Sequence, residues 1–189
     1  MFKEFLSIIL KSLKLDKSLY KDNKNFEEAS IYFAIILILL ISIISLVPGS
    51  ILLKYMSSVF GINDTKGPSI RFYIIMSIIG WLIKTAYLYF IGVVVFPNKS
   101  TKCNFRKLLI VVAYANAPFI FYIFIFNIKL IYFTFVPYLW YSIALIIGVN
   151  EVLKYNNYIK TTIITLAPQI ILLIYFFSLA LKISNGVVS

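Results

Sequence analysis

A few residues that could bind a solute or carry a proton lie within or beside long apolar runs of the sequence. Lys84 lies in the middle of the run 70–96, which contains no acidic residue. A lysine at the centre of a bilayer costs about 2.5–3.5 kcal/mol on insertion scales, so it needs a partner or a path to water. The predicted intramembrane polar site also contains Tyr114, Asn116 and Gln169, together with Pro118, which would kink its helix. Glu151, at the end of an apolar run, is the acid nearest to Lys84 in depth.

Two interpretations of these residues stay open. In the functional interpretation, Lys84, Asn116 and Gln169 form a polar pocket for a small solute or a proton. In the structural interpretation, Lys84 reaches the interface or bonds backbone carbonyls at a helix break, and the amides hold neighbouring helices together. Pro118 would supply such a break, because it removes one backbone donor and frees a carbonyl one turn earlier.

The composition identifies the elements that must position these residues. Of the 189 residues, 61% are hydrophobic and 13% are charged, whereas a soluble domain has about 25% charged residues. Such a chain belongs in a lipid bilayer, and a soluble enzyme is excluded. Because a membrane-spanning helix needs about 20 apolar residues, the sequence predicts an all-α integral membrane protein, a five-helix transmembrane bundle. The membrane domain covers residues 30–182, with spans at about 31–47, 70–96, 108–126, 130–147 and 162–181, and 183–189 form a short tail.

Residues 1–29 are predicted to form a cytoplasmic amphipathic helix followed by a polar connector. At 100° per residue, Lys3, Lys11 and Lys14 share one side of this helix. The other side holds Phe2, Phe5, Leu6, Ile9 and Leu13. A basic amphipathic helix is suited to the membrane interface. The alternative is a helix packed on the cytoplasmic face of the protein itself, and the two can coexist.

The positive charges predict the orientation in the membrane. Most Lys and Arg residues fall in the N-terminal segment and in the loops after spans two and four, which places the N-terminus in the cytoplasm and the C-terminus outside. The net charge of +11 therefore indicates contact with anionic lipid and not with nucleic acid. The expected lipid contacts are Lys3, Lys11, Lys14, Lys99, Lys102, Arg106 and Lys107. Glu151 lies on the same side and is available for a loop interaction.

Several kinds of chemistry lack the residues that they need. The chain has no His and a single Cys, Cys103, so it can form neither an intrachain disulfide nor a Cys cluster for zinc, nor a His-based nucleophilic triad. No nucleophile and base occur at matched depth in the predicted spans. We therefore expect no metal, no cofactor and no enzymatic activity, and a reduced thiol at Cys103.

Three segments carry a resemblance to a known family. They are NFRKLLIVVAYANAP at 104–118, GWLIKTAYLYFIGVVVF at 80–96, and residues 140–160, which contain Gly148, Glu151 and Val152. Their order and spacing resemble the Yip family (Ypt/Rab-interacting proteins), small five-span membrane proteins with a cytoplasmic N-terminus, over about residues 15–182. With residues 1–29 alone ahead of the first span, the chain is similar to the short prokaryotic-type members.

The resemblance implies a membrane-organising scaffold or adaptor in a prokaryotic plasma membrane, with a protein partner at its cytoplasmic face. A small-solute transporter or channel subunit with a polar site around Lys84, Asn116 and Gln169 is the alternative. A monomer and a homo-oligomer are both compatible with the sequence.

Overall fold

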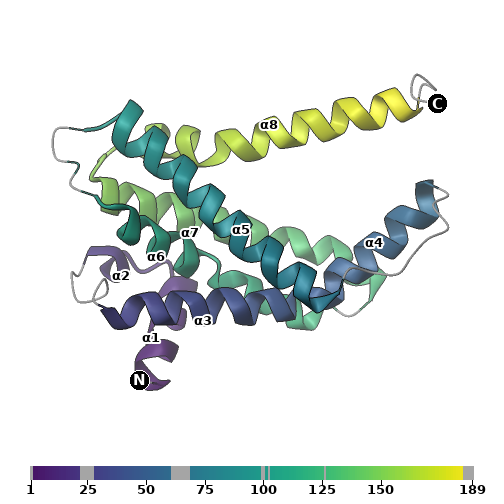
Figure 1. Ribbon diagram of the computed structural model, residues 1–189, viewed down its shortest axis with the longest axis horizontal. Coiled ribbons are helices and arrows are strands. Elements are labelled where there is room, and N and C mark those ends of the chain that lie inside the picture. The colour runs from purple at the N-terminus through teal and green to yellow at the C-terminus, as the bar shows by residue number, and fades with distance from the viewer. Residues whose placement is uncertain are drawn as a thin grey trace.

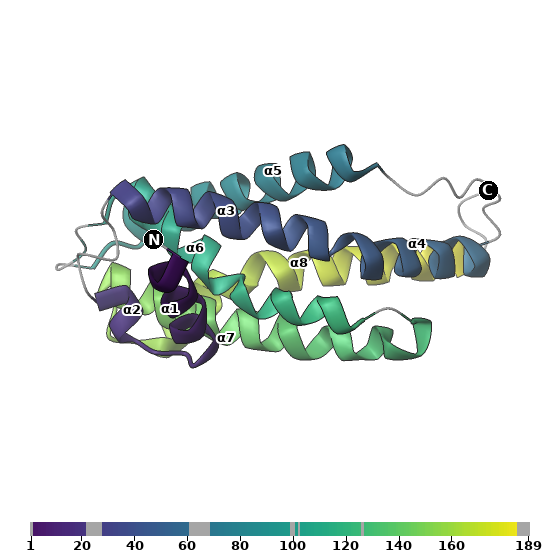
Figure 2. The same ribbon diagram turned by 90° about the horizontal axis from the view of Figure 1, so that it is seen from below.

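The computed structural model describes residues 2–21, 28–60, 69–98, 101, 103–125 and 127–184, and every regular element within these ranges is a helix. The elements are α1 (Phe2–Leu13), α2 (Ser18–Lys21), α3 (Glu28–Ile44), α4 (Leu46–Phe60), α5 (Ile70–Tyr89), the π-helix η2 (Phe90–Val95), α6 (Phe105–Ala115), the 3₁₀-helices η3 (Ala117–Phe124) and η4 (Ile128–Thr134), α7 (Phe135–Leu153) and α8 (Tyr158–Ser184). Helices α3, α5 and α7 run roughly along one long axis (Figures 1 and 2).

Four helical stretches are long and apolar enough to cross a membrane. They are Ser30–Ile51, Ile70–Val95, Phe105–Phe124 and Tyr132–Leu153, and they correspond to the first four predicted spans. Helix α8 contains the predicted fifth span, 162–181, but it is not among the helices that meet this criterion within the described residues. The all-helical membrane architecture is therefore confirmed, whereas a fifth crossing stays a prediction.

The first span differs from the sequence expectation at its end. The sequence predicts that Pro48 and Gly49 end the helix, but α3 ends at Ile44 and α4 begins at Leu46, so Pro48 is its third residue. Proline is tolerated there because the first-turn N–H groups of a helix have no partner in the helix. The backbone bonds continue across the junction, from Ser45 N to Ile41 O and from Gly49 N to Ser45 O. The sequence predicts that the short stretch 50–60 is interfacial or packed against the bundle; in the structure it belongs to α4, which contacts η4.

Helix α6 is the centre of the bundle. It contacts α3, α5 and α7, and every residue from Ile110 to Ala115 has at most 1% of its surface exposed. A helix that is apolar on all sides is expected to be buried on all sides. Helices α3, α5 and α7 therefore all pack against this one helix.

Helix α1 lies across the long axis of the bundle (Figures 1 and 2). Its buried side contains Ile8 and Ser12, and the partly buried Phe5 and Leu13 also pack against the core. The predicted apolar side is thus divided, because Phe2 is 73% exposed and Leu6 is 41% exposed. Leu10, which the sequence did not assign to that side, is exposed next to them. Packing on the protein accounts for one part of the apolar surface, and contact with the membrane interface stays a prediction for the other.

The predicted polar connector contains a buried helical turn, α2. Leu19 and Tyr20 are buried, and the Asp16 carboxylate accepts a hydrogen bond of 2.8 Å from the Ser18 N–H. This bond holds the pKa of the Asp16 carboxyl below its usual value. The Tyr20 ring packs against Gly148 of α7, where an added Cβ would lie 3.1 Å from the ring. The absence of a side chain at Gly148 therefore allows α2 to dock on α7.

Candidate functional site

Lys84 borders a cavity of about 310 Å³ between α3, α5, η3 and α7, which we call the Lys84 cavity. Its lining residues are Ile38, Ile41, Ser45, Ser77, Gly80, Trp81, Lys84, Val112, Asn116, Phe119, Tyr122 and Tyr141. The fold thus brings Lys84 and Asn116 to one cavity, although they lie on different helices. Lys84 is the one charged residue among these lining residues.

Hydrogen bonds of its neighbours fix how α5 presents Lys84. The Trp81 indole Nε1–H donates to the Leu109 carbonyl of α6 at 2.9 Å, and the buried Thr85 hydroxyl donates to the Trp81 carbonyl at 2.8 Å. Lys84 then lies with its Nζ 4.5 Å from the centre of the Tyr141 ring on α7. Such a cation–π contact contributes about 0.5–2 kcal/mol, depending on how well the cation is shielded from water.

The acid expected to be nearest to Lys84 in depth, Glu151, is engaged elsewhere. Its carboxylate lies 3.8 Å from the Lys21 ammonium of α2, with Glu151 mostly buried and Lys21 exposed. Within the described ranges, no carboxylate pairs with Lys84. Glu151 therefore helps to hold α2 on α7, and the Tyr141 ring is the contact that the structure gives to the Lys84 ammonium.

The break at Pro118 positions both Asn116 and helix α1. Because Pro118 has no N–H, it cannot donate to the Tyr114 carbonyl, and the chain changes from α6 to the 3₁₀-helix η3. The Asn116 amide donates to the Val112 carbonyl at 2.6 Å. The Tyr114 carbonyl instead accepts a 2.6 Å bond from the buried Ser12 hydroxyl of α1. The sequence indicated the freed carbonyl but not the residue that bonds it.

Tyr114, Pro118 and Gln169 do not line the Lys84 cavity. Tyr114 is fully buried and donates its hydroxyl to the Ser30 carbonyl at 3.2 Å, so it joins α6 to the start of α3. Gln169 lies on α8 beside Pro168, and neither polar atom of its buried amide has a partner among the described residues. The pocket predicted from three polar residues thus contains Lys84 and Asn116, with Gln169 elsewhere.

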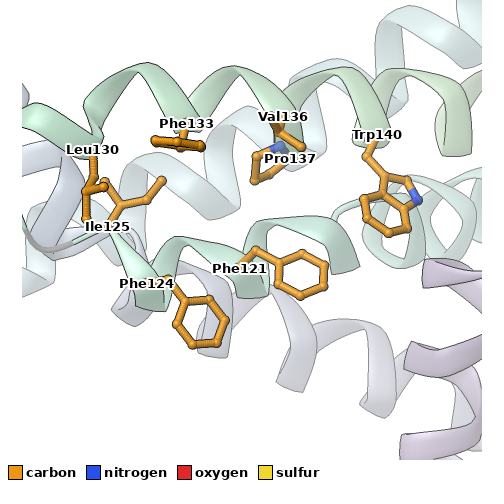
Figure 3. A pocket seen from close by; sticks show the side chains of 8 residues that line it. All are labelled: Phe121, Phe124, Ile125, Leu130, Phe133, Val136, Pro137 and Trp140. Carbon is orange, nitrogen blue, oxygen red and sulfur yellow. The ribbon is translucent and has the colours of Figure 1, made fainter.

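A second cavity, of about 400 Å³, lies between the two arms of the hairpin that joins spans three and four (Figure 3). Its lining residues are Phe121, Phe124, Ile125, Leu130, Phe133, Val136, Pro137 and Trp140. Pro137 and Trp140 point from α7 toward the η3 arm, and the Phe121 and Trp140 rings stack at 5.7 Å. This lining is apolar and aromatic, so it offers no group for acid–base chemistry.

The predicted lipid-contacting residues fall at the end of the bundle formed by α1, α2 and the start of α6. Lys3, Lys14 and Arg106 are exposed, and Lys11 and Lys107 are half-buried. Lys99 and Lys102 lie outside the described residues. Lys17 lies 5.2 Å from the centre of the Tyr158 ring, and its hydrogen bond with Tyr158 raises the pKa of its ammonium. The same end is therefore rich in positive charge.

At this end of the bundle, hydrogen bonds join the segment at the end of η2 to the segment between α7 and α8, which the sequence analysis missed. The Tyr155 hydroxyl, after α7, lies 2.6 Å from the Gly92 carbonyl and 3.0 Å from the Phe96 carbonyl at the end of η2. The Lys160 ammonium donates to the same Phe96 carbonyl at 3.0 Å. Asn98 also bonds the Lys154 carbonyl at 2.9 Å. The sequence carried no clear signal for these contacts, because each joins residues far apart in the chain.

The Yip1 domain family model matches residues 18–180. No curated protein and no solved structure matches the chain. The matched region contains all four candidate spans, the Lys84 cavity and the docked helix α2. Members of this family are non-enzymatic membrane proteins. By this match over most of its length, and with helices able to span a bilayer, the chain is an integral membrane protein that belongs to the Yip1 domain family.

Proposed function

We propose that this protein is a membrane-organising scaffold or adaptor. The end of the bundle that carries α1 and α2 would bind anionic lipid and a protein partner in the cytoplasm. The observation that carries the proposal is the surface of α1. Phe2, Leu6 and Leu10 are spaced one turn apart and exposed, and so are Lys3 on the same helix and Lys14 directly after it.

The position of α1 supports contact with the membrane surface. The helix lies across the bundle axis, so it would lie along the plane of a membrane that the bundle crosses (Figure 2). Exposed apolar residues would enter the headgroup boundary while lysines contact anionic headgroups. Each such lysine contributes about 1 kcal/mol of attraction near an anionic surface.

The orientation belongs to the same proposal. The N-terminus would lie in the cytoplasm, α8 would provide the fifth crossing, and the C-terminus would lie outside, in a prokaryotic plasma membrane. In support, α1 and the end of α8 lie toward opposite ends of the long axis (Figures 1 and 2).

The test neutralises the exposed lysines at the two ends of α1, Lys3 within the helix and Lys14 directly after it. We expect Lys3→Gln with Lys14→Gln to lower, several-fold, the anionic phospholipid that copurifies with the protein in native nanodiscs, as measured by quantitative mass spectrometry. Arg71→Gln with Lys129→Gln, exposed at the other predicted side, serves as the matched control. The same preparations report any stoichiometric protein partner. Unchanged lipid content and the absence of a partner would contradict the proposal.

The Lys84 cavity favours a second candidate function, a small-solute transporter or channel subunit. Its support is that Lys84 and Asn116 line one cavity within helices that could cross the membrane. Lys84→Met should then abolish solute flux through reconstituted vesicles while leaving the fold intact. Equal flux in both proteins would contradict this candidate and leave the scaffold proposal untouched.

A further inference from the structure

Lys84 places a cation in the Lys84 cavity, and no carboxylate among the described residues pairs with it. An ammonium group has three hydrogen-bond donors, and the one contact that the structure gives to Lys84 is the Tyr141 ring face at 4.5 Å. None of the described lining residues is a carboxylate. A charge held at this depth requires a partner of opposite sign or water. An anionic group in the cavity would supply such a partner to the Lys84 ammonium.

The cavity extends from Lys84 toward one end of the bundle. On α5 its lining positions run from Lys84 back to Ser77, which spans about 10 Å at 1.5 Å per residue. On α3 they run from Ile38 to Ser45, in the direction in which that helix ends. Between these positions the walls include Ile41, so an apolar body would fit beyond an anionic group at Lys84.

Gly80 lines the cavity at a point where a side chain would meet no neighbour. A Cβ added at Gly80 would meet no atom within 4 Å, whereas a Cβ at Gly49, Gly92 or Gly148 would lie within 3.0 Å of a side chain. Glycine in a helix interior is less stable than alanine. Close helix packing therefore does not explain glycine at this position, which lies at an exposed part of the cavity lining.

We propose that the Lys84 cavity binds an organic oxyanion, a carboxylate or phosphate group on a short apolar body, with Lys84 as the counter-ion. The apolar body lies along the wall that contains Ile41 and Gly80. A soluble organic acid and an anionic lipid both supply this chemistry. The inference deepens the second candidate function, but binding does not require transport, so a binding measurement tests it separately from flux.

Trp81 lines the cavity and provides the reporter. With Trp140→Phe as the parent, Trp81 is the one remaining tryptophan, because the chain has two. Its fluorescence is followed in phosphatidylcholine nanodiscs during titration with hexanoate, hexyl phosphate or phosphatidylglycerol. Hexanol is the neutral control. A response to hexanoate or hexyl phosphate identifies a soluble acid as the source, and a response to phosphatidylglycerol alone identifies a lipid.

Two pairs of variants test the charge of Lys84 and the open space at Gly80 separately. We expect Lys84→Met to raise the Kd roughly tenfold or more, because a charged partner is lost, and Lys84→Arg to retain binding. Gly80→Leu should weaken binding comparably by filling the cavity, whereas Gly80→Ala should not. Thermal unfolding of each variant verifies that it is folded.

The inference is overturned if Lys84→Met binds as tightly as the parent, if hexanol matches hexanoate, or if none of the anions gives a saturable response. Hexanoate flux into vesicles is measured in parallel. Saturable binding without flux would contradict the transporter candidate while supporting the oxyanion site.

Discussion

At the scale of single residues, Tyr155 joins two segments that are far apart in the chain. Its hydroxyl contacts the carbonyls of Gly92, within η2, and of Phe96, directly after η2, and burial raises the pKa of Tyr155 to about 12. We expect Tyr155→Phe to lower the free energy of unfolding in detergent by about 1–3 kcal/mol, because the buried Gly92 carbonyl loses its donor. Tyr132→Phe, at an 81% exposed position, is the control. Equal stability of the two variants would refute this role.

Cys103 offers a second test at this scale. Its thiol is 8% exposed, and burial raises its pKa to about 12. Because the thiolate is the reactive form, we expect N-ethylmaleimide at pH 8 to modify Cys103 roughly tenfold or more slowly than an exposed cysteine. The comparison protein carries Ser7→Cys with Cys103→Ser, since Ser7 is exposed. Rapid labelling of Cys103 before denaturation would show that the loop is open.

At the scale of elements, α7 approaches α2 and α6 at Gly148. A Cβ there would lie 2.8 Å from Val111 Cγ1 and 3.1 Å from the Tyr20 ring. We expect Gly148→Ala to lower the free energy of unfolding by about 1–3 kcal/mol through overpacking. Gly80→Ala is the matched control and should raise it by about 0.5–1 kcal/mol, because alanine favours a helix and the space is open. Denaturant titration in mixed micelles measures both, and a shift of the same sign in both variants would contradict the packing argument.

At the scale of the whole molecule, the proposed fifth crossing by α8 decides on which side the C-terminus lies. We expect a cysteine at Ser7 to react with a membrane-impermeant maleimide only after lysis, and a cysteine at Ser189 to react in intact cells. Both are placed in a Cys103→Ser background. The physical reason is that an odd number of crossings separates the two ends of a chain. Labelling of both sites from one side would establish four crossings and leave α8 on the membrane surface.

The sequence by itself determined the class of protein and the approximate place of each span. A chain with so few charges and with apolar runs of helical length can be stable only in a bilayer, where backbone groups must bond within their own helix. It also located Lys84 in the second span and the break at Pro118, since both depend on the order of residues along one helix. The match of the Yip1 domain family model agrees with the family resemblance of the same segments.

Only the tertiary structure decided which of these residues meet. Lys84 faces Tyr141 and shares a cavity with Asn116, whereas Gln169 lies elsewhere, and Ser12 bonds the carbonyl that Pro118 leaves free. Hydrophobic periodicity identifies the face of a helix, but not the neighbour that the face contacts. In α3, α5 and α7 that signal is weak as well, because these helices are apolar around most of their circumference. The partners of each polar residue therefore depend on how the helices pack around α6.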